Sequence, residues 1–207
     1  MIAQKLLYLF FILFIHCNVF AQPKKVSSSL FKAMWVLVKG CSLKVAGSTN
    51  INKFVCEIVD YSNADTLVVY NPVTDKIIFP FKGALHLNVT GFNCHNPMMT
   101  SDLCKTLKSK EFPTMKIQFI SLNKLPDFTT PDLQITGLVN IELAGTSGLF
   151  NVNYTFYTDN NKLVHLIGKK VINFSDFKLH PPRKLGGMIR TNQELQVEFH
   201  LTMKEIN

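Results

Sequence analysis

The sequence predicts an all-β protein whose antiparallel strands form either a closed barrel or a stacked sandwich. The 17 Phe residues, together with many Val, Ile and Thr, are a composition typical of strands. Several segments alternate apolar and polar residues, which gives each strand one apolar face. So many one-faced strands cannot lie flat with open edges. A length of 207 residues suits one domain with an accessory segment.

Residues 1–21 are predicted to be a signal peptide. A short basic stretch precedes ten apolar residues at 6–15, and Val19 and Ala21 supply the small residues before a cleavage site. A membrane anchor is the alternative, but a span needs about 20 apolar residues. Lipidation of Cys17 is less favoured, because residues 14–16 lack the small side chain that such processing requires. We therefore expect an exported protein, periplasmic or extracellular.

The remaining chain is expected to hold a polar, flexible lead-in at 22–33 and one domain at 34–207, since no repeat or linker divides it. The clearest strand covers 195–203, where apolar residues alternate with Gln, Glu, His and Thr. Turns are expected at Asn71-Pro72, 145–148 and 159–161. The other expected strands, in chain order, are 42–47, 54–60, 66–70, 76–82, 85–89, 115–119, 139–143, 150–157, 163–168 and 170–175.

One segment departs from the strand pattern. Leu103 and Leu107 lie four residues apart, after Thr100 and before Phe112-Pro113. This spacing, with a Thr or Ser cap before it, predicts a short amphipathic helix near 101–110.

The formal net charge of +8 raises two possible partners, nucleic acid and an anionic membrane surface. Nucleic acid is not expected, because the lysines are scattered and no basic cluster is interleaved with aromatic residues. Solvated strand faces also account for such charge. An anionic membrane surface stays a possible partner.

The sequence holds little that points to catalysis or to a metal. HExxH, GxSxG, glycine-rich phosphate loops and CxxC are all missing. His86 and His200 fall on polar strand faces, and the adjacent pair Cys94 and His95 cannot easily face each other for proton transfer. We expect neither an enzyme, nor a metal site, nor a cofactor other than a lipid.

Four cysteines follow the signal segment: Cys41, Cys56, Cys94 and Cys104. An even number in an exported chain suggests disulfides, with three possible pairings. The spacings of 15, 38 and 10 residues are poor for a metal. Four reduced thiols that pack as small apolar residues are the alternative.

The apolar faces of the strands must enclose an apolar interior. An eight-strand barrel is wide enough either to be packed by its own side chains or to hold one slender ligand. The pattern alone favours neither. The residues offered to this interior, and therefore the candidate ligand-binding residues, are Phe54, Phe79, Phe81, Leu85, Leu87, Met115, Ile117, Phe119, Val139, Ile141, Tyr154, Phe156, Val197 and Phe199.

Several segments together resemble one known family. The opening strand with its Gly47-Ser-Thr turn, the segment around Phe112-Pro113, and the C-terminal run to Arg190 resemble the YceI family of exported lipocalin-like proteins. The resemblance covers about 41–203, and the order and spacing of the motifs carry it more than any single one. The matching segments are 41–54, 99–108, 111–119, 137–141, 172–177, 181–182 and 185–190.

The resemblance implies an extended antiparallel β-barrel of about eight strands, lipocalin-like, with one short helix at an end or side. It also implies non-enzymatic binding or carriage of a long-chain apolar or isoprenoid lipid inside the barrel, in the cell envelope. The alternative is a barrel filled by its own side chains that acts as an envelope interaction or structural module. The chain departs from the more familiar branch of the family, since its opening strands at 41–54 contain no His.

Two structural expectations follow from the segments that resemble the family. Asp176 is expected to accept backbone hydrogen bonds where its strand ends, and Phe177 to anchor the following Pro-rich loop. Cys56 and Cys94 each follow a Phe by two residues. Both belong to segments that resemble another branch of the family, and they are expected to form a disulfide. Cys41 and Cys104 are then expected to be free.

Overall fold

The computed structural model describes residues 31–61, 63–72, 78–128 and 133–206, and these ranges form strands, one α-helix and three 3-10 helices. The predicted all-β class is confirmed. The strands are β1 (Phe31–Leu37), β2 (Cys41–Thr49), β3 (Lys53–Tyr61), β4 (Thr66–Tyr70), β5 (Phe79–Asn88), β6 (Thr114–Leu122), β7 (Ile135–Leu143), β8 (Thr146–Thr158), β9 (Val164–Asn173), β10 (Arg183–Lys184) and β11 (Ile189–Glu205), and the helices are η1 (Val89–Gly91), α2 (Pro97–Thr106), η2 (Phe174–Phe177) and η3 (Leu185–Gly187).

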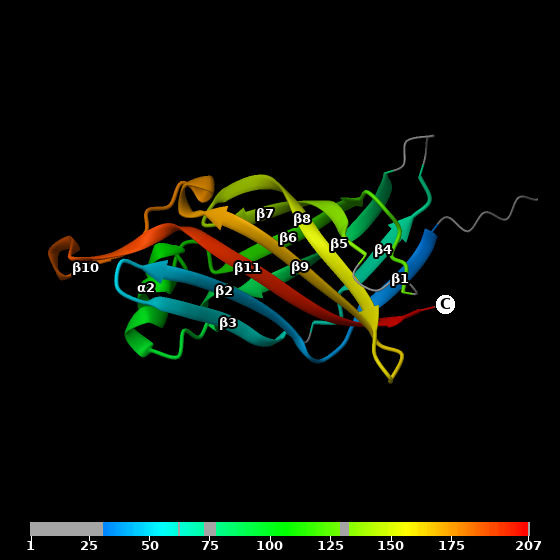
Figure 1. The fold of residues 1–207 in the computed structure, drawn as a ribbon, viewed down its shortest axis with the longest axis horizontal. Helices are drawn as coiled ribbons and strands as arrows, with labels where there is room; N and C mark the ends of the chain where they lie inside the picture. Colours follow the sequence, from blue (N-terminus) through cyan, green and yellow to red (C-terminus); the bar gives the residue numbers. More distant parts are fainter. Residues whose placement is uncertain (1–30, 62, 73–77, 129–132, 207) are drawn as a thin grey trace, which may run out of the picture.

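Eight strands form a closed antiparallel barrel in the order β1-β4-β5-β6-β7-β8-β9-β11. The ring closes because β11, 17 residues long, pairs with β9 on one edge and with β1 on the other. Residues 203–205 of β11 pair with β1, whereas residues 191–200 pair with β2. The hairpin of β2 and β3 therefore extends the wall beyond β1, toward the end of the molecule where α2 lies (Figure 1).

The helix is confirmed but lies four residues earlier than expected. It covers Pro97–Thr106 instead of 101–110, because the Asn96 side chain caps it by accepting hydrogen bonds from the backbone N–H groups of Met98 and Met99. Pro97 fits the first turn, where no backbone donor is needed. Residues 107–110 form turns that lead to β6.

Two pairs of expected strands are each one continuous strand. Segments 79–82 and 85–88 merge in β5, whose register shifts between Pro80 and Gly83, and residues 76–77 of the first expected strand lie outside the described residues. Gly83 allows this bend, because its φ of 140° suits glycine and a Cβ there would lie 2.6 Å from the Thr66 carbonyl oxygen. Segments 163–168 and 170–175 merge in β9, which ends at Asn173 where η2 begins.

The expected lead-in at 22–33 ends earlier than predicted. Phe31 and Ala33 already belong to β1, because they pair with Tyr70 and Val69 of β4 and so close the ring. The predicted signal peptide at 1–21 and residues 22–30 lie outside the described residues. Among the residues the structure describes, no helix is long and apolar enough to cross a membrane.

Two histidines meet on the outer wall of the barrel. His165 Nδ1 lies 2.9 Å from His200 Nε2, and His165 Nε2 lies 3.3 Å from an Asp159 carboxylate oxygen. Thr202 and Glu198 flank the pair on β11. Burial, together with the charge of His165, lowers the pKa of His200 below its usual 6.5, and the nearby Glu198 only partly offsets this.

This pair makes stability depend on pH. As pH falls through about 6.5, the unfolded chain takes up a proton at residue 200 that the folded chain does not, so the folded state loses stability. We expect the free energy of unfolding, measured in urea between neutral and mildly acidic pH, to fall toward acid. His200→Gln should flatten this dependence, whereas the exposed control His180→Gln should not. An unchanged slope in His200→Gln would contradict the assignment.

Candidate functional site

The barrel interior is divided into a packed part and a hollow part. Near β1 and β4 the aromatic rings of five buried residues fill the space and contact one another, with ring centroids 4.9 to 6.4 Å apart. We call this set the aromatic plug. It consists of Trp35, Phe81, Phe119, Tyr154 and Phe156. Burial raises the pKa of the Tyr154 phenol, so this ring stays neutral inside the plug.

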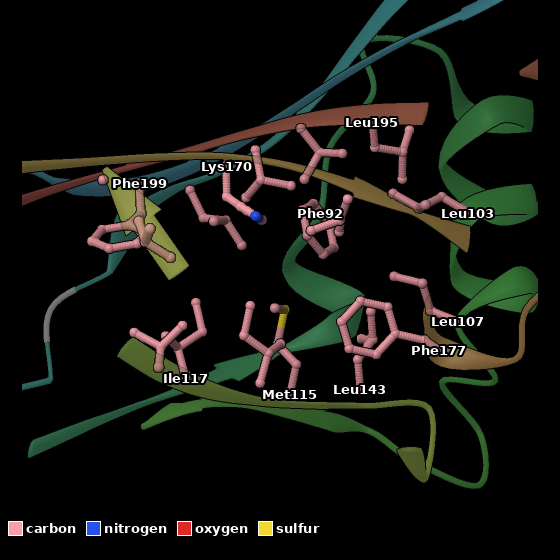
Figure 2. Close-up of a pocket in the computed structure, with 18 residues that line it drawn as sticks. Phe92, Leu103, Leu107, Met115, Ile117, Leu143, Lys170, Phe177, Leu195 and Phe199 are labelled. Atoms are coloured by element: carbon pink, nitrogen blue, oxygen red, sulfur yellow. The ribbon is translucent and has the colours of Figure 1, made fainter. Parts of the chain in front are cut away.

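An apolar cavity continues from the aromatic plug toward α2. Phe199 bounds it on the plug side, because its ring lies 5.9 Å from Phe119, and Leu103 and Leu107 bound it on the helix side (Figure 2). This inner cavity has a volume of about 60 Å³. Its lining residues are Leu43, Val45, Phe92, Leu103, Leu107, Met115, Ile117, Val139, Ile141, Leu143, Val152, Gly168, Lys170, Ile172, Phe177, Leu195, Val197 and Phe199.

A more open groove lies outside the inner cavity, between α2 and the β2–β3 hairpin. The groove has a volume of about 230 Å³. Val45, Leu103 and Leu195 line both spaces, so these three side chains form the partition between them. At the edge of the groove Lys184 Nζ lies 2.6 Å from an Asp102 carboxylate oxygen. Both spaces are largely apolar, and the three shared side chains separate the inner cavity from the groove, which is open to the surface.

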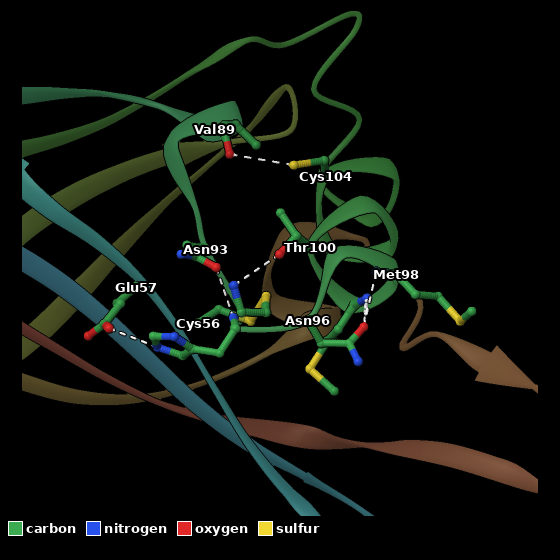
Figure 3. The surroundings of a disulfide bond; sticks show 11 residues. Cys56, Glu57, Val89, Asn93, Asn96, Met98, Thr100 and Cys104 are labelled. Atoms are coloured by element: carbon green, nitrogen blue, oxygen red, sulfur yellow. Dashed lines mark hydrogen bonds and ion pairs between the residues drawn. A yellow bond between two sulfur atoms is a disulfide. The ribbon is translucent and has the colours of Figure 1, made fainter.

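A disulfide fastens the start of α2 to the barrel wall. Cys56 of β3 and Cys94 of the loop before α2 are bonded, with Cα atoms 3.9 Å apart (Figure 3). Beside it, Glu57 and Asn93 exchange backbone hydrogen bonds of 2.9 and 2.8 Å, and His95 Nε2 lies 2.9 Å from a Glu57 carboxylate oxygen. The expected pairing is thus present, and the loop serves as a partner for the outer edge of β3.

The other two cysteines, Cys41 and Cys104, are free. Cys41 is buried beneath β11, where burial raises the pKa of its thiol. Cys104 lies on α2, and its thiol points to the Val89 carbonyl oxygen at 3.7 Å.

The structure divides the expected ligand-binding residues between these regions. Phe54 lines the outer groove, and Leu85 and Leu87 line a small void beside Cys41. Phe81, Phe119, Tyr154 and Phe156 line neither the inner cavity nor the groove, because they pack into the aromatic plug, and Phe79 packs against the core. Those that line the inner cavity are Met115, Ile117, Val139, Ile141, Val197 and Phe199.

Asp176 and Phe177 lie at the end of β9, in η2. An Asp176 carboxylate oxygen accepts a hydrogen bond of 2.8 Å from the Asn173 backbone N–H, which caps the short helix. Phe177 is buried, lines the inner cavity and stacks on Phe150 with ring centroids 5.5 Å apart. Phe177 therefore belongs to the cavity wall as well as to the turn.

Sequence reasoning missed four lining residues that matter. Leu103 and Leu107 were identified only as the apolar face of a helix, and the spacing did not reveal what that face covers. Phe92 lies in a loop without periodicity. Lys170 follows the inward row of Leu166 and Gly168, but the expected break of β9 after residue 168 concealed this. Within the described ranges, no three His, Cys, Asp or Glu side chains are arranged to hold a metal ion.

The disulfide should contribute strongly to stability, because it closes a loop of 38 residues. By the chain-entropy estimate, Cys56→Ala with Cys94→Ala should lower the free energy of unfolding in urea by about 3–4 kcal/mol. Cys104→Ala, a free thiol on α2, is the control and should change it little. A double variant as stable as the unmodified oxidised protein would contradict this role.

No protein-family model matches the chain, and no curated protein matches it. Solved structures share its fold, among them these two. BcnA of Burkholderia cenocepacia aligns with a TM-score of 0.56 at 12% identity, over 78% of this chain and 95% of that one. A polyisoprenoid binding domain from Saccharophagus degradans, implicated in plant cell wall breakdown, aligns with a TM-score of 0.54 at 9% identity, over 84% and 99%. The antiparallel barrel with one short helix that the resemblance implies is therefore confirmed as the fold.

Proposed function

We propose that the protein binds a long-chain apolar lipid without catalysis and carries it in the cell envelope. The observation that carries this proposal is the inner cavity, an apolar space inside a closed barrel whose other part is solidly packed. Proteins pack their cores to high density. An apolar cavity that stays unfilled beside such a core is therefore typical of a ligand-binding site. The outer groove connects to the surface, so the hydrocarbon chain of a bound lipid can extend into it.

Burial of apolar surface supplies the binding energy, at about 25 cal/mol per Å² less the cost of fixing a flexible chain. The inner cavity is narrow, so a bound chain needs side chains of its wall to move. Leu103 and Leu107 on α2 and the unbranched Met115 are suited to this, because they belong to the helix face or have flexible side chains. The disulfide keeps the start of α2 in place while Leu103 and Leu107, on the apolar face of the helix, move to admit the ligand.

An isoprenoid chain is the favoured class of ligand. The solved polyisoprenoid binding domain with this fold supports that choice, and a slender chain suits the small volume of the inner cavity. We also propose export, on the basis of the basic and apolar residues in segment 1–21. Carriage of a lipid in the cell envelope requires a location outside the cytoplasm.

A barrel filled by its own side chains, acting as an envelope interaction module, is the second candidate. The aromatic plug favours it, since five buried rings leave no room for a ligand near β1 and β4. Native mass spectrometry separates the two functions, because a carrier purified from its own cells retains lipid and a filled barrel does not.

Blocking the inner cavity should abolish lipid binding. In Met115→Trp the larger side chain occupies the space in the middle of the wall shown in Figure 2, so we expect the loss of co-purified lipid in native mass spectra. Val59→Trp adds the same ring to an exposed position of β3 and serves as the control. Thermal unfolding shows that both variants fold. Full lipid occupancy in Met115→Trp would refute the cavity as the binding site.

The end of the barrel that carries the groove is suited to contact an anionic membrane. Leu185 and Met188 are 70% and 75% exposed on the loop after β10, which projects beyond the barrel in Figure 1. Asn50 ties this loop to the β2–β3 turn through the Met188 carbonyl oxygen and the Arg190 backbone. Segments 48–54 and 183–192 contain four basic residues and no acidic one, and of these four Lys184 is paired with Asp102 of α2. Apolar side chains with basic neighbours are typical of interfacial membrane contact.

Replacing these apolar side chains should weaken membrane binding. We expect the protein to co-sediment with vesicles of phosphatidylcholine and phosphatidylglycerol more than with phosphatidylcholine alone, because the rim is basic. Leu185→Ser with Met188→Ser should reduce this binding at least about tenfold, since each side chain contributes on the order of 1 kcal/mol. Val59→Ser with Val171→Ser, exposed on the wall, is the control. Equal binding by both double variants would contradict the proposal.

A further inference from the structure

Lys170 is a charged residue in an otherwise apolar row that faces the barrel interior. In the antiparallel register it lies opposite Val197, and the neighbouring pairs are Gly168 with Phe199 and Ile172 with Leu195. All of these residues line the inner cavity. Figure 2 shows the Lys170 nitrogen directed into the space between Phe199 and Phe92.

The ammonium group of Lys170 has no ion pair or hydrogen bond with any residue that the structure describes. Its neighbour Lys169 differs, because Lys169 points outward and its Nζ lies 3.1 Å from a Glu198 carboxylate oxygen. The inner cavity has no acidic residue in its lining. The Lys170 side chain thus faces the inner cavity without a polar partner among the residues that the structure describes.

Such a charge persists only if water or a ligand reaches it, since an unpaired charge is costly to bury. The pairing of β8 with β9 ends at Asn153 and Lys169, so Lys170 is the first residue of β9 without a partner on β8. Lys170 also lines a hollow on the outer surface, together with Asn151 and Asn153. Lys170 therefore lies at a place where β8 no longer continues the wall between the inner cavity and the outer surface.

We propose that Lys170 binds the acidic head group of the lipid, so that the ligand is an anionic amphiphile with a carboxylate or phosphate at one end of a long chain. This rests on the proposed function, in which a lipid occupies the inner cavity. An anion beside Lys170 forms a charge-assisted hydrogen bond, which the apolar surroundings strengthen.

The position of Lys170 also sets the orientation of the ligand. Lys170 lies between Phe199, on the closed side of the cavity, and Leu103 and Leu107, on the side of α2 (Figure 2). The head group therefore enters first, and the tail extends past the helix into the outer groove. There Phe54, Met99 and Ile189 offer apolar surface to it.

Binding of matched charged and uncharged chains tests this proposal. The full exported chain, stripped of lipid, is titrated with palmitate, cetyl phosphate and the uncharged cetyl alcohol, each displacing N-phenylnaphthylamine, an uncharged fluorescent probe. We expect at least one anion to bind about 10- to 100-fold more tightly than the alcohol, the range of a charge-assisted hydrogen bond. Which anion binds more tightly separates a carboxylate from a phosphate head group.

Variants assign the preference to Lys170. Lys170→Met, which keeps the length of the side chain, should remove the preference for the anion and leave the alcohol bound as before. Lys170→Arg should retain the preference, and Lys169→Met, the outward neighbour, should leave it unchanged. Thermal unfolding checks that each variant folds.

Equal affinity of the unmodified protein for anion and alcohol would overturn the role of Lys170 while the proposed function stands. The same holds if Lys170→Met keeps the preference. If none of the chains displaces the probe, the proposed function itself fails. If Lys170→Met does not fold, Lys170→Gln, which also removes the charge, takes its place in the comparison of anion and alcohol.

Discussion

The long strand β11 determines how this barrel is closed and where it is open. One edge of β11 pairs with β9, and the other edge is shared between β1 and β2. Because β1 uses only residues 203–205, the wall made by β2 and β3 continues past the closed ring. That extension has a free outer edge at β3, and a free edge must be covered or paired. The loop before α2 supplies the cover through the Glu57–Asn93 bridge and the Cys56–Cys94 disulfide.

The size of the side chains then determines which part of the interior stays hollow. Near β1 and β4 the inward residues are aromatic, and their rings contact one another across the barrel. Toward α2 the inward residues are mostly Leu, Val, Ile and Met, which are too short to meet at the centre. Phe199 stands at the boundary. Its ring lies against Gly168, where a Cβ would come within 2.2 Å of the ring, so the ring lies close against the wall.

The same arrangement places the inner cavity next to the outer groove and to the exposed loops at that end of the barrel. The helix that bounds the inner cavity also bounds the outer groove, and the partition between them consists of three side chains that line both spaces. Beyond the groove, the β2–β3 turn and the loop after β10 are joined through Asn50 and present apolar and basic side chains together. A ligand that leaves the barrel by this path would meet the surface proposed to contact a membrane.

The sequence by itself determined the all-β class, the short helix and the inward parity of residues such as Ile117, Ile141 and Phe199. It did so because a period of two and the spacing of Leu103 and Leu107 are local properties of the chain. The resemblance to a family added the barrel and the Cys56–Cys94 pair. Only the tertiary structure decided that Phe119 and Tyr154 fill the interior whereas Met115 borders a cavity, since both kinds of residue share the same parity. It also decided that Lys170 faces inward, with no partner in the described part of the chain. Which side chains meet across a closed barrel depends on strands that are distant in sequence, and local pattern carries no information about such contacts.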